Sequence, residues 1–317
     1  MTDTQDISSP ARQSGRRRGD RIVGASSAMK ESVDQATRAA RSNAPVLVAG
    51  PPGSGRGHLA RSVHAWSARA NVPLIVFSAA GTPGDQHLRE LFGVTPPAEP
   101  LIDGGHDGVL ARAAEGTVLI ERIDQLIDEA RAALGRAISQ QSFTRVGDSD
   151  AIPLRARVLA TGEAGADAGL GGGFEVISIA ALTDRSDDIL PLAAHFLAEF
   201  TAQDGAEPVG FTNDARRWLV EEPWSGNVRE LSERIRQAVR LSGGGAISAE
   251  ALMLATEGEE VPSFKEAKRA FETRYVEGLL RRCNGNISRA ARLAKKDRKD
   301  FYDVIRRTGV DPAQFRP

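Results

Sequence analysis

The chain has 317 residues, of which 41% are apolar and 26% charged, as in an ordinary globular protein. A single cysteine, Cys283, excludes a disulfide framework within the chain, and no apolar run is long enough to cross a membrane. Because the first residues also lack the apolar stretch of a signal peptide, we expect a cytoplasmic protein without membrane contact. The net charge is -1, but residues 262–317 carry a balance of +8 and the remainder -9. This asymmetry indicates a nucleic-acid-binding module at the C-terminal end.

The N-terminal half predicts a disordered tail followed by an α/β subdomain. Residues 1–20 are rich in Ser, Gln and Arg without apolar periodicity, which predicts a disordered basic tail. From residue 21 onward, short apolar runs alternate with helical patterns. The runs that predict buried strands are 45–49, 73–77, 117–120 and 157–161. We therefore predict a mostly parallel sheet with helices on both faces over residues 21–185.

The C-terminal half predicts helices only. Residues 186–255 form a predicted helical subdomain, and residues 256–262 form a polar linker before an all-α domain at 263–317. A long helix is predicted at 264–282, and its expected apolar face is Ala267, Phe271, Tyr275, Leu279 and Leu280.

Two short helices across a tight turn complete this predicted domain. Asn286 is expected to cap the first, and Asp297 the second, at about 298–307. The residues expected to face inward are Ala290, Ala291, Leu293, Phe301, Val304 and Ile305. Such a pair, with a second helix rich in Arg and Lys, is typical of a recognition helix that enters the major groove of DNA.

The basic side chains on the outside of this pair are the candidate DNA contacts. Arginine and lysine can reach guanine edges or bind phosphates, although a basic helix can also be simply solvated. The residues that we expect to contact double-stranded DNA are Arg289, Lys295, Lys296, Arg298, Lys299, Arg306 and Arg307.

A glycine-rich turn, Gly50-Pro-Pro-Gly-Ser-Gly55, lies between the first predicted strand and a predicted helix. Backbone N–H groups of such a turn can bind phosphate, although tight turns also need glycine for other reasons. The P-loop pattern is G-x-x-x-x-G-K-[ST], whereas this chain has Arg56 in place of Lys and Gly57 in place of the hydroxyl that binds magnesium. The predicted nucleotide contacts in the turn are Gly50, Gly53, Ser54, Gly55, Arg56 and Gly57. The loss of the hydroxyl at position 57 would remove one magnesium ligand.

Seven segments occur in the order found in the AAA+ domain of sigma-54-dependent transcriptional activators, the NtrC-type enhancer-binding proteins. They are residues 50–56, 90–93, 116–123, 143–147, 157–161, 182–189 and 224–231. Residues 21–255 resemble that domain, and Trp224-Ser-Gly-Asn-Val-Arg-Glu-Leu231 is similar to the family's WPGNVREL. The C-terminal segment resembles the Fis-type helix-turn-helix of these activators. No segment resembles their phosphorylatable receiver domain.

The resemblance implies an AAA+ P-loop NTPase-like sheet with a helical lid, which binds ATP, assembles as a ring and remodels sigma-54 RNA polymerase. The family's Walker A lysine then corresponds to Arg56, its Walker B Asp-Glu pair to Glu121 and Arg122, and its sensor II arginine to Arg229. Glu121 could still face a magnesium ion and Arg229 is retained, so both join the predicted nucleotide site. The resemblance implies ATP or ADP as the ligand, and we do not expect magnesium to contribute. Arg122 stays protonated and cannot act as a general base.

By the same comparison, two further features of the family are absent from this sequence. An ungapped count places the arginine fingers at Gly165 and Gly171, and glycine offers no charge to a phosphoryl group. The GAFTGA loop that contacts the sigma factor should lie between Gly93 and Gly108, where this sequence lacks the motif.

The sequence thus predicts a DNA-binding transcription regulator whose degenerate AAA+ domain binds nucleotide weakly without hydrolysis. We assign no catalytic residue and no metal site, because the scattered histidines do not have a metal-binding spacing. Two alternatives stay open: an active ATPase that remodels sigma-54 RNA polymerase, and a non-catalytic scaffold for partner AAA+ subunits. Expected partners are DNA, RNA polymerase, other AAA+ subunits and a second copy bound through the C-terminal domain, as in Fis-type modules.

Overall fold

The computed structural model describes residues 22–95, 105–167, 170, 173–203, 209–242, 245–255 and 264–315, without the side chains of residues 264–271 and 274. The chain forms two compact units. One consists of Met1–Phe196 and Leu219–Ser232, and the other of Leu197–Trp218 and Glu233–Pro317.

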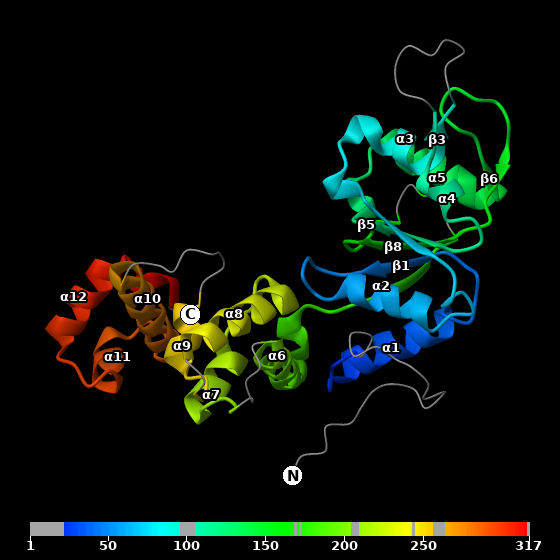
Figure 1. Cartoon of the computed structure of the whole chain (residues 1–317). Helices are drawn as coiled ribbons and strands as arrows, with labels where there is room; N and C mark the ends of the chain where they lie inside the picture. The colour runs from blue at the N-terminus through cyan, green and yellow to red at the C-terminus, as the bar shows by residue number, and fades with distance from the viewer. Residues whose placement is uncertain are drawn as a thin grey trace. The chain divides into compact units, whose positions relative to one another are not determined.

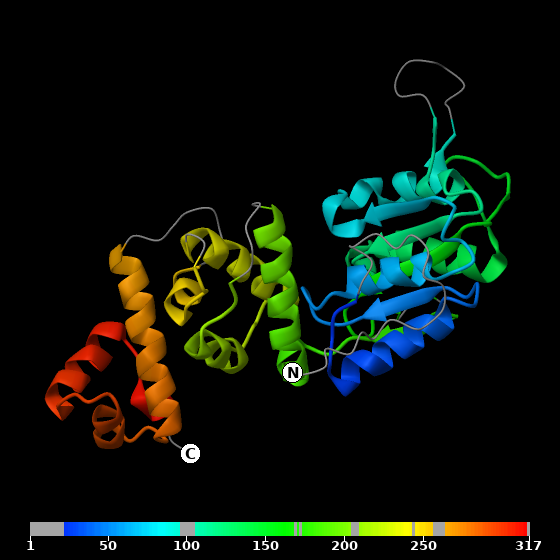
Figure 2. The same ribbon diagram turned by 60° about the horizontal axis from the view of Figure 1, so that its bottom comes forward.

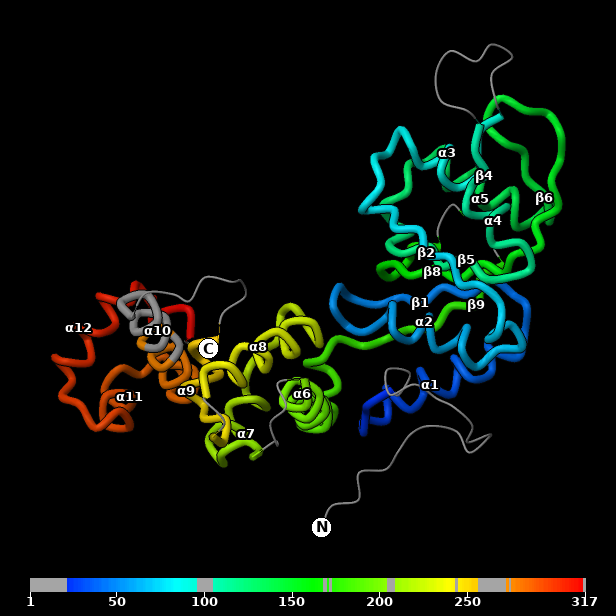
Figure 3. The backbone as a smooth tube through the Cα atoms, viewed as in Figure 1, coloured from blue at the N-terminus to red at the C-terminus, as the bar shows by residue number. Residues whose placement is uncertain are grey.

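The first unit is built on a parallel sheet with strand order β2-β5-β8-β1-β9. Its strands are β1 (Val46–Ala49), β2 (Leu74–Ser78), β5 (Thr117–Glu121), β8 (Arg157–Gly162) and β9 (Glu175–Ser178). Neighbouring strands pair in parallel throughout, and Figure 3 shows β8 between β5 and β1. The four predicted strands are present, and β9 is an additional strand at one edge.

Helices cover both faces of this sheet. Successive strand residues point to opposite sides, so an apolar strand presents an apolar face to each layer of helices. Val46 and Val48 pack with α1 (Ser27–Ala39) and α2 (Arg56–Ala65) on one face. Leu47 and Ala49 pack on the other face with three further helices. These are α3 (His87–Phe92), α4 (Val109–Arg112) and α5 (Asp128–Gln140). Figure 1 shows the two groups of helices on opposite sides of the sheet, so the expected α/β fold is confirmed.

Two short antiparallel pairs accompany the sheet. β3 (Gly93–Val94) pairs with β4 (His106–Asp107), and β6 (Ser142–Phe143) pairs with β7 (Ile152–Pro153). Residues 96–104, most of the stretch expected to lack the sigma-contacting motif, lie outside the described residues, as does Gly171.

Helices make up the chain from residue 189 onward, as the sequence predicts. They are α6 (Ile189–Gln203), α7 (Asn213–Glu221), α8 (Asn227–Ser242), α9 (Ala249–Leu254), α10 (Phe264–Arg282), α11 (Ile287–Leu293) and α12 (Arg298–Thr308), and Figure 2 shows them from a second side. No helix in the described part of the chain combines the length and the apolar composition that a bilayer crossing requires.

The last three helices share a core of their own. Its buried residues are Val276, Leu280, Cys283, Ala290, Ala291, Phe301 and Ile305. Asn286 caps α11 as predicted, because its side chain accepts a hydrogen bond of 3.0 Å from the Arg289 N–H. Asp297 is the N-cap residue of α12, but its side chain makes no capping hydrogen bond.

Two residues predicted for this core are exposed instead. Tyr275 is 45% exposed and Val276 is buried in its place, whereas Leu279 and Leu280 of the predicted face pack in the core. Leu293 is 55% exposed, because Ala290, Ala291 and Ala294 form the inward stripe of α11 and Leu293 lies beside it. Ala267 and Phe271 lie outside the side chains that the structure describes.

Candidate functional site

The glycine-rich turn joins the carboxyl end of β1 to the first residue of α2. Gly53 and Gly55 have φ values of 76° and 101°, in the left-handed region that favours glycine. The Gly50 N–H donates to the Gly162 carbonyl at 3.1 Å, which ties the turn to β8. The Ser54 hydroxyl is buried and has no hydrogen-bond partner among the described residues. The turn therefore has the strand–loop–helix geometry that places backbone N–H groups around a phosphate.

The Trp224–Leu231 segment packs directly against this turn. A Cβ on Gly53 would collide with the Gly226 carbonyl oxygen, so the close approach requires glycine at position 53. The Arg229 N–H donates to the Gly53 carbonyl at 3.2 Å, and the Asn227 amide donates to the Pro52 carbonyl at 3.0 Å. Since the Asn227 Oδ1 also accepts a bond of 2.8 Å from the Leu182 N–H, Asn227 links three segments of the first unit.

Arg56 is 8% exposed, and its Nη1 donates to the Gly50 carbonyl at 2.6 Å. Burial lowers the pKa of Arg56, Asp124 and Glu163 counteract this, and Arg122 and Arg229 lower it further. The structure thus gathers the predicted Arg56 and Arg229 in one charged cluster with these carboxylates.

Glu121 ends β5, and its carboxylate is bound to an arginine of the chain itself. The Arg61 Nη2 donates to the Glu121 Oε1 at 2.7 Å, and the Arg61 Nη1 donates to the Gly57 carbonyl at 3.1 Å. The two paired side chains are 46% and 29% exposed. Arg61 was not among the site residues predicted from the sequence, although it lies one helical turn after Gly57.

Arg122 follows β5 in a left-handed conformation, with φ of 56°. Its N–H donates to the Thr161 hydroxyl on β8 at 3.1 Å. A residue other than glycine in this region costs conformational energy and is often part of a functional site. Within the described ranges, no group of three or more His, Cys, Asp or Glu side chains is suited to hold a metal ion.

A buried ion pair contacts the glycine-rich turn through the Ser54 carbonyl, and neither of its members was predicted from the sequence to belong to the site. The Arg185 Nη2 donates to the Ser54 carbonyl at 2.6 Å, and its Nη1 lies 3.5 Å from the Asp188 Oδ2. The Asp188 carboxylate also accepts from the N–H groups of Ala25 and Ser26 and from the Ser26 hydroxyl. Burial lowers the pKa of Arg185, and Asp188 opposes that shift.

The side chains predicted to contact DNA are all exposed, and they come from α11, the following turn and α12. They are Arg289, Lys295, Lys296, Arg298, Lys299, Arg306 and Arg307. Lys295 has φ of 51°, and the Lys296 N–H donates to the Ala291 carbonyl at 3.0 Å, which closes the turn. The Arg307 Nη2 donates to the Glu272 carboxylate on α10 at 2.7 Å, so Arg307 also holds α12 against α10.

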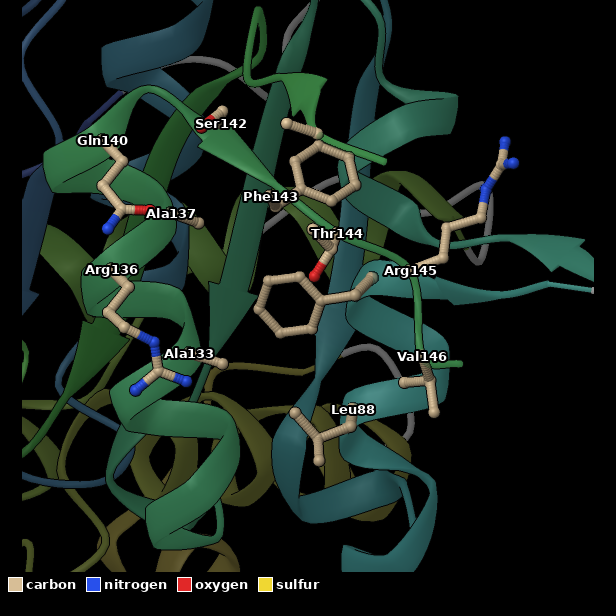
Figure 4. Close-up of a pocket in the computed structure, with 12 residues that line it drawn as sticks. Leu88, Ala133, Arg136, Ala137, Gln140, Ser142, Phe143, Thr144, Arg145 and Val146 are labelled. Atoms are coloured by element: carbon tan, nitrogen blue, oxygen red, sulfur yellow. The ribbon is translucent and has the colours of Figure 1, made fainter. Parts of the chain in front are cut away.

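A cavity of about 310 Å³ lies between α3, α5 and the segment that begins at β6 (Figure 4). Its lining includes apolar Leu88 and Phe143 and basic Arg136 and Arg145. No lining residue belongs to the glycine-rich turn or to β5, so the predicted site residues do not form this cavity.

Comparisons with known proteins agree on one family. Residues 22–169 match the sigma-54 interaction domain, and residues 183–269 match the AAA+ ATPase lid domain. The transcriptional regulatory protein ZraR of Escherichia coli (strain K12) is 30% identical over 301 residues, which are 90% of this chain and 68% of ZraR. The transcriptional regulatory protein GlrR of the same strain is 29% identical over 308 residues, which are 93% of this chain and 69% of GlrR.

Solved structures of NtrX from Brucella abortus have the same fold. Its complex with ADP matches with a TM-score of 0.64 at 25% identity, over 92% of this chain and 69% of that chain. Its complex with ATP matches with a TM-score of 0.63 at 25% identity, over 91% of this chain and 69% of that chain.

Proposed function

The chain belongs to the family of transcriptional regulators that carry a sigma-54 interaction domain, and we propose that it is a DNA-binding member whose AAA+ domain binds nucleotide weakly without hydrolysing it. One observation carries the proposal. Arginines stand where the resemblance places the phosphate-binding lysine and the water-positioning glutamate, and Arg56 and Arg122 belong to one charged cluster beside the glycine-rich turn.

The loss of hydrolysis follows from what these side chains can do. A general base must accept a proton, and the guanidinium of Arg122 has no free lone pair to accept one. Glu121 is already bound to Arg61, and Gly165 can supply no charge in place of an arginine finger. The groups of an ATPase site act as a unit, so the joint loss of several removes turnover rather than slowing it slightly.

Nucleotide binding remains part of the proposal, because the backbone of the turn is intact. Gly53 and Gly55 keep their left-handed geometry, and Arg56 and Arg229 add positive charge. Crystals of NtrX from Brucella abortus with ADP and with ATP support a nucleotide as the ligand of this fold. We expect ADP or ATP to bind weakly, because the magnesium-binding hydroxyl is replaced by Gly57.

We assign DNA binding to the C-terminal three helices, as a Fis-type helix-turn-helix. A short turn between α11 and α12, an exposed basic face on α12 and the +8 balance of residues 262–317 support this assignment. We propose that the chain is divided into an AAA+ subdomain (21–185), a lid (186–255), a linker (256–262) and a DNA-binding domain (263–317). Dimerisation through α10, oligomers of the AAA+ domain and cytoplasmic location belong to the same proposal. Contact with RNA polymerase rests on family membership alone.

Binding of double-stranded DNA by the full chain tests this assignment. The double substitution Arg298→Ala, Lys299→Ala should weaken specific binding at least about tenfold and reduce the salt dependence of binding, because fewer counterions are released. The matched control is Arg216→Ala, Arg217→Ala, which removes two exposed arginines from α7. Equal affinity of the wild type and the α12 variant in a salt titration would exclude this helix from the DNA contact.

A further inference from the structure

The cation bound to the Glu121 carboxylate comes from the chain itself. In P-loop NTPases, the hydroxyl after the lysine and a carboxylate at the end of a second strand of the sheet bind a magnesium ion. Here the Arg61 guanidinium lies between these two positions, at 2.7 Å from Glu121 and 3.1 Å from the Gly57 carbonyl. The residues present do not fit a magnesium site.

We infer that the Arg61 guanidinium replaces the magnesium ion at the glycine-rich turn, so that this chain binds nucleotide without a divalent cation. The inference rests on the proposed nucleotide binding. It extends that proposal by naming the residue that supplies the counter-charge and the form of the ligand, which is the metal-free nucleotide.

The geometry at position 57 is the first support. A Cβ on Gly57 would stand 3.1 Å from the Arg61 Nη1 and 3.4 Å from the Glu121 Oε1. A serine or threonine there would add an oxygen beyond this Cβ, and the Arg61 guanidinium would have to shift. The absence of a side chain at position 57 thus leaves room for Arg61 to reach Glu121 in its present conformation.

The chemistry of the two cations is the second support. Magnesium requires near-octahedral oxygen ligands, which a carboxylate already engaged in a charge-assisted hydrogen bond cannot freely supply. A guanidinium has five N–H donors in a planar fork that suits phosphate oxygens, and the bonds to Glu121 and Gly57 use one donor each. Arg61 can thus stay on Glu121 and still donate to a phosphate.

The experiment compares ADP binding to the full chain by calorimetry in EDTA and in excess magnesium. For the wild type we expect equal affinity in the two buffers, within about twofold. Arg61→Gln should bind ADP about tenfold more weakly in EDTA, a loss of about 1.4 kcal/mol. Arg61→Lys should keep most of the EDTA affinity, since it keeps the charge. The matched control Arg38→Ala, on an exposed position of α1, should behave as the wild type.

A triple variant that should gain magnesium dependence distinguishes a specific effect from a simple loss of folding. Gly57→Ser, Arg61→Ala, Glu121→Asp restores the usual metal ligands, and its ADP affinity should rise at least about tenfold when magnesium is added. Wild-type binding that requires magnesium would overturn the inference and leave the proposed nucleotide binding intact. Equal EDTA affinity of the wild type and Arg61→Gln would also overturn it. Absence of ADP binding in both buffers would overturn the inference and the proposed nucleotide binding together.

Discussion

Gly53 and Gly55 have the same left-handed backbone but different surroundings. A Cβ on Gly53 would collide with the Gly226 carbonyl oxygen, whereas a Cβ on Gly55 would meet no atom within 4 Å. The pair therefore separates the cost of the backbone conformation from the cost of lost contact with the Trp224–Leu231 segment.

We predict that Gly55→Ala lowers the free energy of unfolding by about 1 kcal/mol, the cost of a left-handed residue other than glycine. Gly53→Ala should cost about 1–3 kcal/mol more, because the added methyl group forces the two backbones apart. Urea unfolding followed by circular dichroism measures both changes. Equal losses in the two variants would show that the contact with Gly226 contributes nothing.

His64 gives the first unit a predictable dependence on pH. It is buried on α2, its Nδ1 lies 2.9 Å from the Thr117 hydroxyl, and burial followed by the charge of Arg157 lowers its pKa. The unfolded chain therefore binds more protons at His64 than the folded chain. Its contribution to stability is complete above the unfolded pKa of about 6.5 and is lost as the pH falls from there toward the lower folded pKa.

We predict that His64→Gln reduces the slope of unfolding free energy against pH between about pH 7 and 5, because glutamine does not titrate. Glutamine can still hydrogen-bond to Thr117, so the substitution tests the charge more than the contact. Urea unfolding across this pH range is the measurement. A variant with the full wild-type slope would show that another group is responsible.

The residues at the glycine-rich turn were only partly predictable. The glycine-rich motif located Arg56, and the family resemblance located Glu121 and Arg229. Neither revealed the pairing of Arg61 with Glu121, since the two residues are 60 positions apart and meet only when α2 packs beside β5. A sequence motif identifies which residues belong to a site, whereas the hydrogen-bond partners of these residues depend on how distant elements pack.

Among the elements, β9 shows why a strand can escape sequence analysis. The other four strands contain apolar runs, and these runs predicted them. This holds even for β2 at the opposite edge, where only Phe77 is buried but Leu74–Phe77 is a run of four apolar residues. β9 is a short edge strand in which Ile177 is buried and Val176 is 43% exposed. Only Val176 and Ile177 are apolar in β9, between Glu175 and Ser178, which is too short a run to detect, and the strand forms because β1 offers a free edge for pairing.

The Arg185–Asp188 pair connects three elements, namely the N-terminal end of α1, the 3₁₀ turn at Leu182–Asp188 and the glycine-rich turn. Both side chains are almost fully buried, at 3% and 0% exposure. A buried charge without its partner destabilises the folded state strongly. Removing one member of the pair should therefore lower the stability by more than the intact pair adds to it.

We predict that Asp188→Asn lowers the free energy of unfolding by about 3–5 kcal/mol, because it leaves the Arg185 charge buried without a counter-ion. Asp187→Asn is the matched control, since Asp187 is the exposed neighbour, and it should change stability by less than about 0.5 kcal/mol. Urea unfolding provides the comparison. Similar small losses in both variants would mean that solvent or another group compensates Arg185.

At the scale of the whole molecule, the part of the chain proposed to bind DNA and the part proposed to bind nucleotide have opposite net charge. The C-terminal 56 residues carry the +8 balance, and the remainder is acidic. If the chain binds DNA as proposed, its long-range attraction to DNA comes from the C-terminal residues, whereas the acidic remainder adds repulsion. The sequence alone predicted the α/β sheet, the lid helices and the three C-terminal helices, because each has a clear periodicity.

Phosphate release from ATP tests most directly the proposal that this AAA+ domain does not hydrolyse nucleotide. We predict no release above background from the wild-type chain. The double substitution Arg56→Lys, Arg122→Glu should not restore it, because Gly165 would still lack the charge of an arginine finger and catalytic groups act as a unit. Robust release by this double variant would show that the finger positions are misassigned. Release by the wild type at a rate typical of AAA+ ATPases would contradict the claim.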